Sequence, residues 1–158
     1  MDFLGPIEFE LFFKIIVSFI LGIIVGIERE FAGKEAGPRT YSLVAIGTTL
    51  FTIMSLDSIF AGENARIIAQ IVTGIGFLGA GLIIFHKSKV HGLATAAGMW
   101  SMAAIGIAVG MGYYAVSIFA VLMALLSLYV FRKINFDDNL RKLVGYKDDG
   151  QSNNEKSE

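Results

Sequence analysis

The side chains with the greatest capacity for chemistry stand at the edges of apolar runs. Glu28, Arg29 and Arg39 lie in a charged stretch, residues 28–39, between two such runs. A charge that abuts an apolar run needs a partner, so we expect a Glu28–Arg39 pair or a pair of Arg29 with a glutamate. A solvated loop is the alternative interpretation. A paired set would serve gating or partner docking, with the sensing of cytosolic ions as a further role.

A second polar group opens the third apolar run. Arg66 and Gln70 are four residues apart and Thr73 follows one turn later, so the three share one region of a helix surface. One interpretation is an arginine that reaches toward water beside a hydrogen-bonded glutamine. The other is a mouth or gate that faces Asp57 or Glu63.

Glycines dominate the remainder of that run, at Gly74, Gly76, Gly79 and Gly81. Their spacing matches the dinucleotide fingerprint G-x-G-x-x-G, but that motif needs a preceding strand and a phosphate-facing loop. We therefore expect the glycines to allow close helix packing in lipid, with an unwound segment lining a cavity as the alternative. Gly76 and Ala80 also form a small-xxx-small pair, four residues apart, and this spacing is repeated in other runs by Gly22/Gly26, Ala94/Gly98 and Gly106/Gly110.

The other polar residues form no catalytic constellation. Thr95 and Trp100 fit packing and interhelical hydrogen bonds better than catalysis. His86 and His91 are five residues apart, a poor metal-ligand spacing, and no carboxylate lies at the middle of an apolar run. Cysteine is absent, which excludes thiolate chemistry. We therefore expect no enzyme, no cofactor and no bound metal.

Five apolar segments must position these residues, at about 9–27, 40–56, 67–85, 93–111 and 113–131. At a rise of about 1.5 Å per helical residue, each can cross the hydrocarbon core. Hydrophobic residues make up 54% of the 158 and charged residues 17%, so a soluble fold would expose a large apolar surface. The sequence predicts an all-α membrane protein with about five transmembrane helices.

The basic residues predict how these helices are oriented. Eleven of the thirteen lie in 28–39, in 86–92 or after residue 131. These segments share the inner side if the N-terminus faces outward, so we expect an N-out/C-in, multi-pass protein of the plasma (inner) membrane. Gly112 must then form a tight hairpin. Lys14, inside the first span, can pair with Glu10 one turn earlier.

Charge also suggests how the chain is divided. Ten of its 27 charges lie in residues 135–158, so we expect a membrane domain over 1–134 and a polar cytosolic tail, partly disordered, over 135–158. The N-terminus lacks the features of a cleaved signal peptide, and the first run is expected to be retained. The small-residue pairs motivate a homodimer in the lipid bilayer. A nucleic-acid partner is not expected.

Four blocks of the sequence resemble the MgtC/SapB membrane proteins: Gly26–Glu30, Ala36–Thr40, Arg66–Gly81, and Val90–Ala97 with Trp100. The resemblance implies a bacterial-type inner-membrane protein linked to Mg²⁺ homeostasis and to low-Mg²⁺ or stress adaptation. It further implies a non-enzymatic regulator of a membrane partner, such as ATP synthase. Longer members carry an ACT-like soluble domain after the spans, and this chain is expected to be a short form without it. The alternative is a cation or small-solute channel or secondary transporter that uses the glycine-rich third helix.

Overall fold

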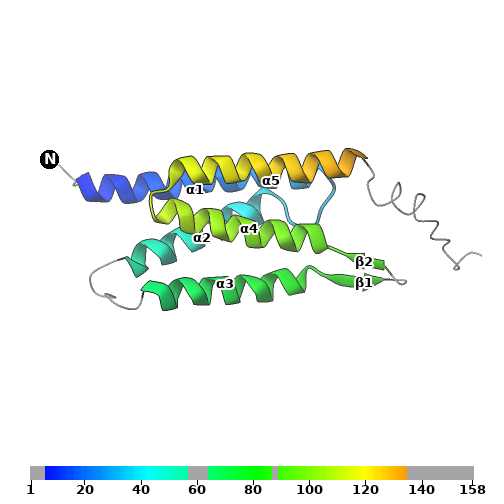
Figure 1. Ribbon diagram of the computed structural model, residues 1–158, viewed down its shortest axis with the longest axis horizontal. Helices are drawn as coiled ribbons and strands as arrows, with labels where there is room; N and C mark the ends of the chain where they lie inside the picture. The colour runs from blue at the N-terminus through cyan, green and yellow to red at the C-terminus, as the bar shows by residue number, and fades with distance from the viewer. Residues whose placement is uncertain (1–5, 57–63, 87–88, 135–158) are drawn as a thin grey trace, which may run out of the picture. The chain divides into compact units, whose positions relative to one another are not determined.

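The computed structural model describes residues 6–56, 64–86 and 89–134. Within these ranges it contains five helices and one two-stranded sheet (Figure 1). In chain order the elements are α1 (Pro6–Phe31), α2 (Pro38–Ser55), α3 (Asn64–Gly81), β1 (Ile84–His86), β2 (Lys89–His91), α4 (Leu93–Gly110) and α5 (Tyr114–Ile134). The prediction of an all-α protein is confirmed, and each predicted segment corresponds to one helix.

Local sequence explains several helix ends. Pro38 occupies the first turn of α2, where its fixed φ suits a helix and its missing N–H is not needed. After α4, Gly112 adopts a φ of 86°, a left-handed conformation that glycine adopts at little steric cost. The chain therefore reverses into α5 within a few residues, and the predicted tight hairpin at Gly112 is confirmed.

The third apolar segment ends earlier than the sequence predicts. α3 stops at Gly81, and β1 and β2 pair as a short antiparallel hairpin in which Phe85 faces Val90. The prediction of a helix to residue 85 is therefore wrong at its C-terminal end. A Cβ at Gly92 would collide with the carbonyl oxygen of Leu82, so this close approach at the base of the hairpin requires glycine.

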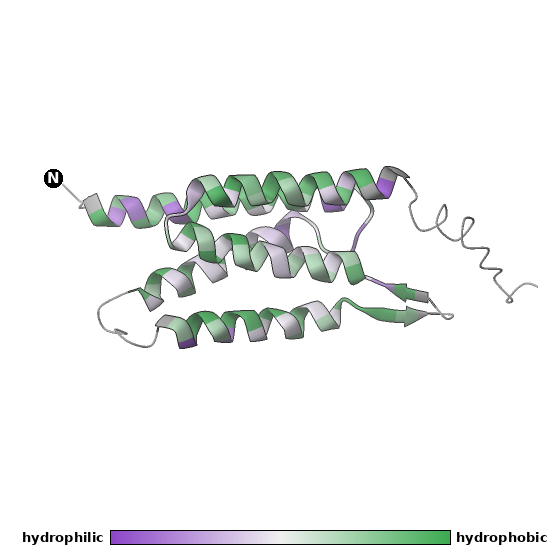
Figure 2. Ribbon diagram, in the orientation of Figure 1, coloured by the Kyte–Doolittle hydropathy of each residue, from purple (hydrophilic) through white to green (hydrophobic). Residues whose placement is uncertain are grey.

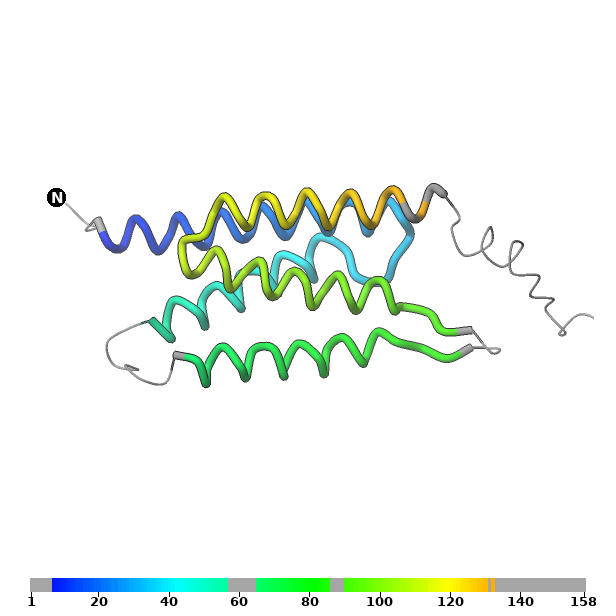
Figure 3. Tube along the Cα trace, in the orientation of Figure 1, coloured from blue at the N-terminus to red at the C-terminus, as the bar shows by residue number. Residues whose placement is uncertain are grey.

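α2 is the central helix of the packing. It packs most extensively against α1 and next against α4, while α3 packs on α4 and, to a lesser extent, on α2. Consecutive helices run in opposite directions (Figure 3). At the start of α5, the ring of Tyr114 packs edge-on against Phe13 of α1, with 5.5 Å between ring centroids.

The interior is unusually polar and the exterior unusually apolar. Hydroxyl side chains are buried along the helices: Ser18, Ser42, Thr48, Thr49, Thr52, Ser55, Thr95 and Ser117. Large apolar side chains are exposed instead, including Phe12, Phe19, Phe77 and Phe119. Figure 2 shows α5 strongly hydrophobic and α2 paler. This distribution suits a protein surrounded by lipid. Exposure of apolar side chains to water costs free energy, whereas their exposure to lipid does not.

Length and composition identify two of the described helices as able to cross a membrane. They are α1, over Ile7–Phe31, and α4, over Leu93–Gly110. α3 and α5 hold shorter apolar stretches, Ala65–Gly81 and Tyr114–Val130.

Two compact units divide the chain, Met1–Leu126 and Ser127–Glu158. The first holds α1 to α4, the hairpin and most of α5, and all sites described below lie within it. In the second, the structure describes the last part of α5, where the Arg132 guanidinium lies 5.8 Å from the ring centroid of Tyr129. The predicted tail, 135–158, lies outside the described residues.

Candidate functional site

A buried charged pair lies near the C-terminal end of α1. The Arg29 side chain is 2% exposed and the Glu28 side chain 13%. The Arg29 Nε donates a hydrogen bond of 2.6 Å to Glu28 Oε2, and the Arg29 Nη2 lies 2.5 Å from the same oxygen. Of the two pairings expected from the sequence, the structure has that of Arg29 with a glutamate, and the glutamate is its chain neighbour.

Tyr41 is a further buried polar residue, and it lies in the first turns of α2. Its hydroxyl donates a hydrogen bond of 3.2 Å to the carbonyl oxygen of Thr95, at the start of α4. The Arg29–Glu28 pair of α1 and the Tyr41–Thr95 hydrogen bond between α2 and α4 are the buried polar contacts near these helix ends; we call the four residues the polar cluster.

The polar cluster suits positioning and not group transfer. Its charges sit beside each other in a largely dry setting, where either one alone would be costly to bury. Charged groups inside membrane proteins are expensive and commonly mark functional sites.

Glycines allow the three helices to meet closely. A Cβ on Gly22 would lie 2.6 Å from Ser42 Cα, and one on Gly26 would overlap the backbone of Pro38. In α4, a Cβ on Gly106 would overlap Thr48 Oγ1, and one on Gly110 would lie 2.7 Å from Thr52 Cβ. The close packing predicted for Gly22/Gly26 and Gly106/Gly110 is confirmed. A Cβ on Gly98 would come within 2.5 Å of the Tyr41 hydroxyl.

Most of the buried serine and threonine hydroxyls donate hydrogen bonds to backbone oxygens, whereas the buried Tyr114 hydroxyl has no partner among the described residues. Thr49 Oγ1 donates to the carbonyl oxygen of Gly106 at 2.8 Å, which links α2 to α4. Other hydroxyls donate within their own helix, as Ser18 does to Ile15 and Thr52 to Thr48. Such bonds satisfy the polar groups that lipid cannot.

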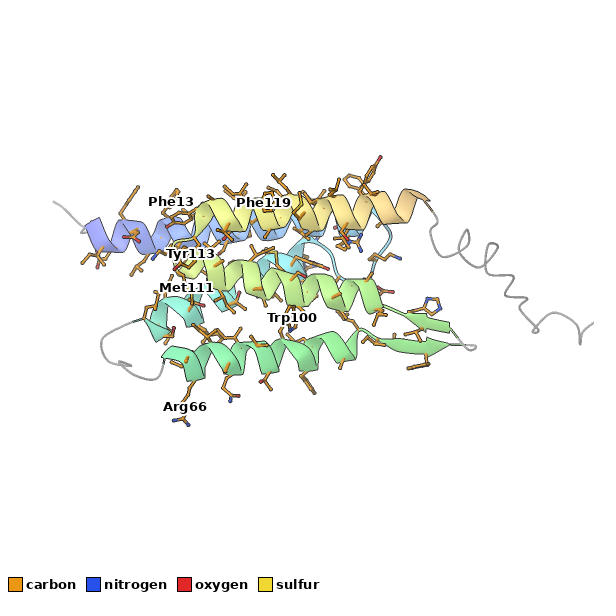
Figure 4. The ribbon with its side chains drawn as sticks, viewed as in Figure 1. Phe13, Arg66, Trp100, Met111, Tyr113 and Phe119 are labelled. Atoms are coloured by element: carbon orange, nitrogen blue, oxygen red, sulfur yellow. The ribbon has the colours of Figure 1, made fainter. Side chains whose placement is uncertain are left out.

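A groove of about 1180 Å³ opens between α2 and α3, with Met99 of α4 contributing to its lining. Its walls come mainly from apolar residues, among them Leu43, Val44, Phe51, Ile67, Ile71, Ile75 and Leu78. Two of its lining residues are charged, Arg39 and Arg66, and Gln70 lies one turn from Arg66. The side chains of all three are exposed. In Figure 4 the Arg66 side chain projects away from the helices at the start of α3.

The glycines of α3 do not behave alike. A Cβ on Gly79 would lie 3.7 Å from the Cβ of Ala96 in α4, an ordinary contact. A Cβ on Gly74, Gly76 or Gly81 would meet nothing within 4 Å. Within this chain, close packing is therefore found at Gly79, whereas Gly74 lines the groove. α3 is continuous from residue 64 to 81, so the unwound segment considered from the sequence is absent from it.

Other predicted residues lie apart from the polar cluster. Trp100 is 53% exposed, so it does not provide the interior packing that the sequence suggested. Thr73 hydrogen-bonds to Ala69 of its own helix. Asp57 and Glu63, the residues that a gate at Arg66 was expected to face, are outside the described residues.

The predicted Lys14–Glu10 ion pair is confirmed at 3.0 Å. Arg39, the other predicted partner of Glu28, makes no ion pair within the part of the chain that the structure describes. Among those residues, no group of three or more His, Cys, Asp or Glu could hold a metal ion.

Sequence reasoning missed Tyr41. It lies inside an apolar run, one residue after the Arg39–Thr40 pair, so its sequence context indicates a membrane span and not a site. A tyrosine usually finds a hydrogen-bond partner when buried. Applied to Tyr41, which follows a charged turn, this rule indicates a buried hydroxyl with a hydrogen-bond partner.

The apolar exterior, hydroxyl-bearing interior and buried ion pair define a helical membrane protein built around the polar cluster. Residues 15–136 match the MgtC family, and the chain belongs to that family. No solved structure gives a significant match.

Several relatives are similar to this chain. "Putative magnesium transporter YhiD" of Escherichia coli K12 is 40% identical over 136 residues, which cover 80% of this chain and 63% of that protein. "Protein SrpB" of Synechococcus elongatus is 35% identical, covering 84% of this chain and 78% of SrpB. "Protein MgtC" of Brucella abortus is 46% identical over 97 residues, covering 60% of this chain and 40% of that protein. The chain thus spans less than two thirds of the length of the E. coli relative.

Proposed function

We propose that this chain is a multi-pass protein of the plasma (inner) membrane that serves Mg²⁺ homeostasis as a non-enzymatic regulator of a membrane partner. Its five helices all cross the bilayer, with the N-terminus outside and the C-terminus inside. The partner is another integral complex, such as ATP synthase. Membership of the MgtC family and the E. coli relative's name, which refers to magnesium, support the link to Mg²⁺.

The observation that carries the regulatory role is the closed interior of α1, α2 and α4. Glycine contacts bring these helices together at backbone distance, and the hydroxyls between them hydrogen-bond to protein oxygens. A path for a hydrated cation would need free polar groups along its walls. A closed interior instead favours a protein that acts through its outer surfaces, and α3 offers outward-facing Gly76 and Gly81 for contact with a partner helix.

The groove along α3 favours a second candidate, a channel or secondary transporter. Gln70 and Arg66 line one end, and the volume of about 1180 Å³ would accommodate a small solute. Its largely apolar wall and its two arginines disfavour a cation as the transported species, because both charges would repel it. This candidate therefore fits a small or anionic solute better than Mg²⁺.

Flux into proteoliposomes distinguishes the two functions. The purified protein should give no Mg²⁺ flux, and neither should the Arg66→Ala variant. Flux that the wild type shows and Arg66→Ala loses would establish transport and remove the regulatory proposal.

A matched pair of variants tests partner contact by α3. In a strain that depends on this protein for growth at low Mg²⁺, Gly76→Leu should abolish growth without changing protein level, because it blocks an outer surface. Trp100→Leu, a change on exposed α4 surface, is the control. Normal growth with Gly76→Leu would exclude α3 as the contact surface.

A further inference from the structure

The two walls of the groove between α2 and α3 repeat with the spacing of a helix contact. On α3 the lining residues Ile67, Ile71, Gly74 and Leu78 follow one another at steps of four, three and four, and the same steps lead along α2 from Thr40 to Phe51. Alternating steps of four and three make the heptad spacing with which helices pack along one another. We propose that the groove is the interface of a homodimer, in which α3 of a second copy packs against α2 and α3 of the first.

The groove is longer than one leaflet is thick. Arg39 lines it in the first turn of α2 and Arg66 in the first turn of α3, and these helices run in opposite directions (Figure 3), so the arginines mark its opposite ends. At about 1.5 Å per residue, Arg39 lies about 24 Å from the end of α2 at Ser55, and Arg66 about 3 Å from the start of α3 at Asn64. The groove is therefore about 20 Å long, whereas one leaflet contributes about 15 Å of hydrocarbon. A transmembrane helix fits this length better than an acyl chain that ends at the midplane.

Gln70 supplies a polar group that can pair with itself. Its amide both donates and accepts hydrogen bonds, and its exposed side chain lines the groove. Within the described part of the chain it forms no hydrogen bond. It lies about 9 Å along α3 from the start of the helix, a depth at which lipid offers no hydrogen-bond partner. In a two-fold symmetric dimer the same residue of the second copy is the partner, because a residue near the axis faces its own counterpart.

Gly47 and Gly74 allow the second helix to come close. Both line the groove, and a Cβ at either would meet nothing within 4 Å. Gly47 lies about 12 Å from the end of α2 and Gly74 about 15 Å from the start of α3, so the two glycines lie at similar depth on facing walls. Helices in membranes associate through small residues of this kind. The small-residue pairs of α1 and α4 are already filled by contacts within the chain, which leaves the groove as the glycine-bearing surface open to a second copy.

The end of the groove at Arg39 has charges of both signs nearby. Glu35 lies four residues earlier, in the turn before α2. Both side chains are exposed, and neither makes an ion pair among the residues that the structure describes. A two-fold axis can pair each with the other in the second copy, since such an interface is self-complementary. Exposed pairs add little affinity, but they help to fix the register.

An unrelated membrane protein would have to supply a heptad stripe, a buried amide and a matching charge independently, whereas a second copy carries all three. The dimer rests on α2 and α3 crossing the bilayer, as proposed above. It goes beyond the regulatory role and, because it fills the groove, it counts against the transporter.

Cross-linking in native membranes tests the interface. The chain holds no cysteine, so a single introduced thiol reports on one position. A disulfide requires Cα atoms within about 7 Å, and a helix contact at Gly74 provides that approach. Gly74→Cys should therefore give a disulfide-linked dimer on mild oxidation. Gly76→Cys is the matched control: it faces equally open space on the same helix but does not line the groove, and it should stay monomeric.

Energy transfer between labelled copies in lipid vesicles measures the affinity. Donor and acceptor dyes are attached to Tyr113→Cys, an exposed position outside the groove. Gln70→Leu should raise the dimer dissociation constant about threefold, the effect of one interhelical hydrogen bond. Thr73→Val should not, because Thr73 bonds within its own helix. Gly74→Leu should abolish the transfer.

Two results would overturn the proposal. They are a Gly74→Cys protein that cross-links no better than Gly76→Cys, and equal dissociation constants for Gln70→Leu and Thr73→Val. A photo-crosslinker on Gly74→Cys that labels phospholipid or another protein, and not a second copy, would assign the groove to that occupant instead. The growth test of Gly76→Leu concerns another face of α3, so failure of the dimer and failure of the regulatory role are separate results.

Discussion

At Arg29, a guanidinium that is 2% exposed shares Glu28 Oε2 through two of its nitrogens. A buried ion pair of this kind need not stabilise a fold relative to an apolar pair. Removal of one member is different, because the other charge stays buried and loses this counter-charge. The polar cluster is thus sensitive to single substitutions and tolerant of paired ones.

We therefore predict that Arg29→Met lowers the free energy of unfolding by about 3–5 kcal/mol. Glu28→Gln combined with Arg29→Met should recover part of that loss, since the double variant buries neither charge. Thermal unfolding in detergent measures both. Lys34→Met, which removes an exposed charge, provides the control, and an Arg29→Met protein as stable as this control would contradict the burial of the pair.

Single glycines also fall into two classes, those with a close backbone neighbour and those that face open space. Gly22 faces the backbone of Ser42 at distances that exclude a Cβ, whereas Gly47 faces open space. Gly22→Ala should destabilise the protein by about 1–3 kcal/mol through overpacking. Gly47→Ala should leave the stability unchanged or slightly raise it, since alanine is the better helix former. Equal unfolding midpoints for the two variants would refute the close α1–α2 contact.

At the scale of helices, α2 and α4 are held together by Tyr41 against Gly98. Gly98→Ala should destabilise the protein because its Cβ would approach the Tyr41 hydroxyl to 2.5 Å. Tyr41→Phe removes that oxygen, and the nearest remaining ring carbon would lie 3.5 Å away. The cost of Gly98→Ala should therefore be smaller in the Tyr41→Phe background. A double-mutant cycle of unfolding free energies gives the coupling, and strict additivity would contradict the contact.

The sequence predicts all five helices because hydropathy over long runs is a strong signal. It does not predict the hairpin, since Leu82–Phe85 extends the apolar run of α3 without a break in composition. Where that run changes from helix to strand depends on the approach of Gly92 to Leu82. Such a contact between residues ten positions apart leaves no trace in hydropathy.

The candidate site is predicted only in part for a similar reason. Charge at the edge of an apolar run identified Glu28 and Arg29. The identity of the third partner, Tyr41, depends on how α2 rotates against α4. The outward position of Gly76 likewise depends on helix rotation, which spacing alone does not specify.

For the whole molecule, the absence of cysteine makes orientation directly measurable. The N-out/C-in prediction places Lys34, between α1 and α2, inside and Tyr113, between α4 and α5, outside. In intact cells a membrane-impermeant thiol reagent should label Tyr113→Cys and not Lys34→Cys, and it should label both after permeabilisation. Both side chains are exposed, so access is not limiting. Labelling of Lys34→Cys alone would reverse the orientation, and equal labelling of both variants would mean an even number of crossings between the two positions instead of the three predicted, α2, α3 and α4.

The central helix has a consequence for how this protein is made. α2 is not among the described helices that qualify as spans by hydropathy, and its buried side carries Thr48, Thr49, Thr52 and Ser55. Alone in lipid, it would expose Thr48, Thr49 and Thr52, which pack against α4 in the folded protein, and Ser42, which packs against Gly22 of α1. Insertion machinery that tests one segment at a time would therefore not release α2 into the lipid on its own. We therefore expect α1 and α2 to leave the translocation channel together, as a preassembled hairpin joined through Gly22 and Gly26.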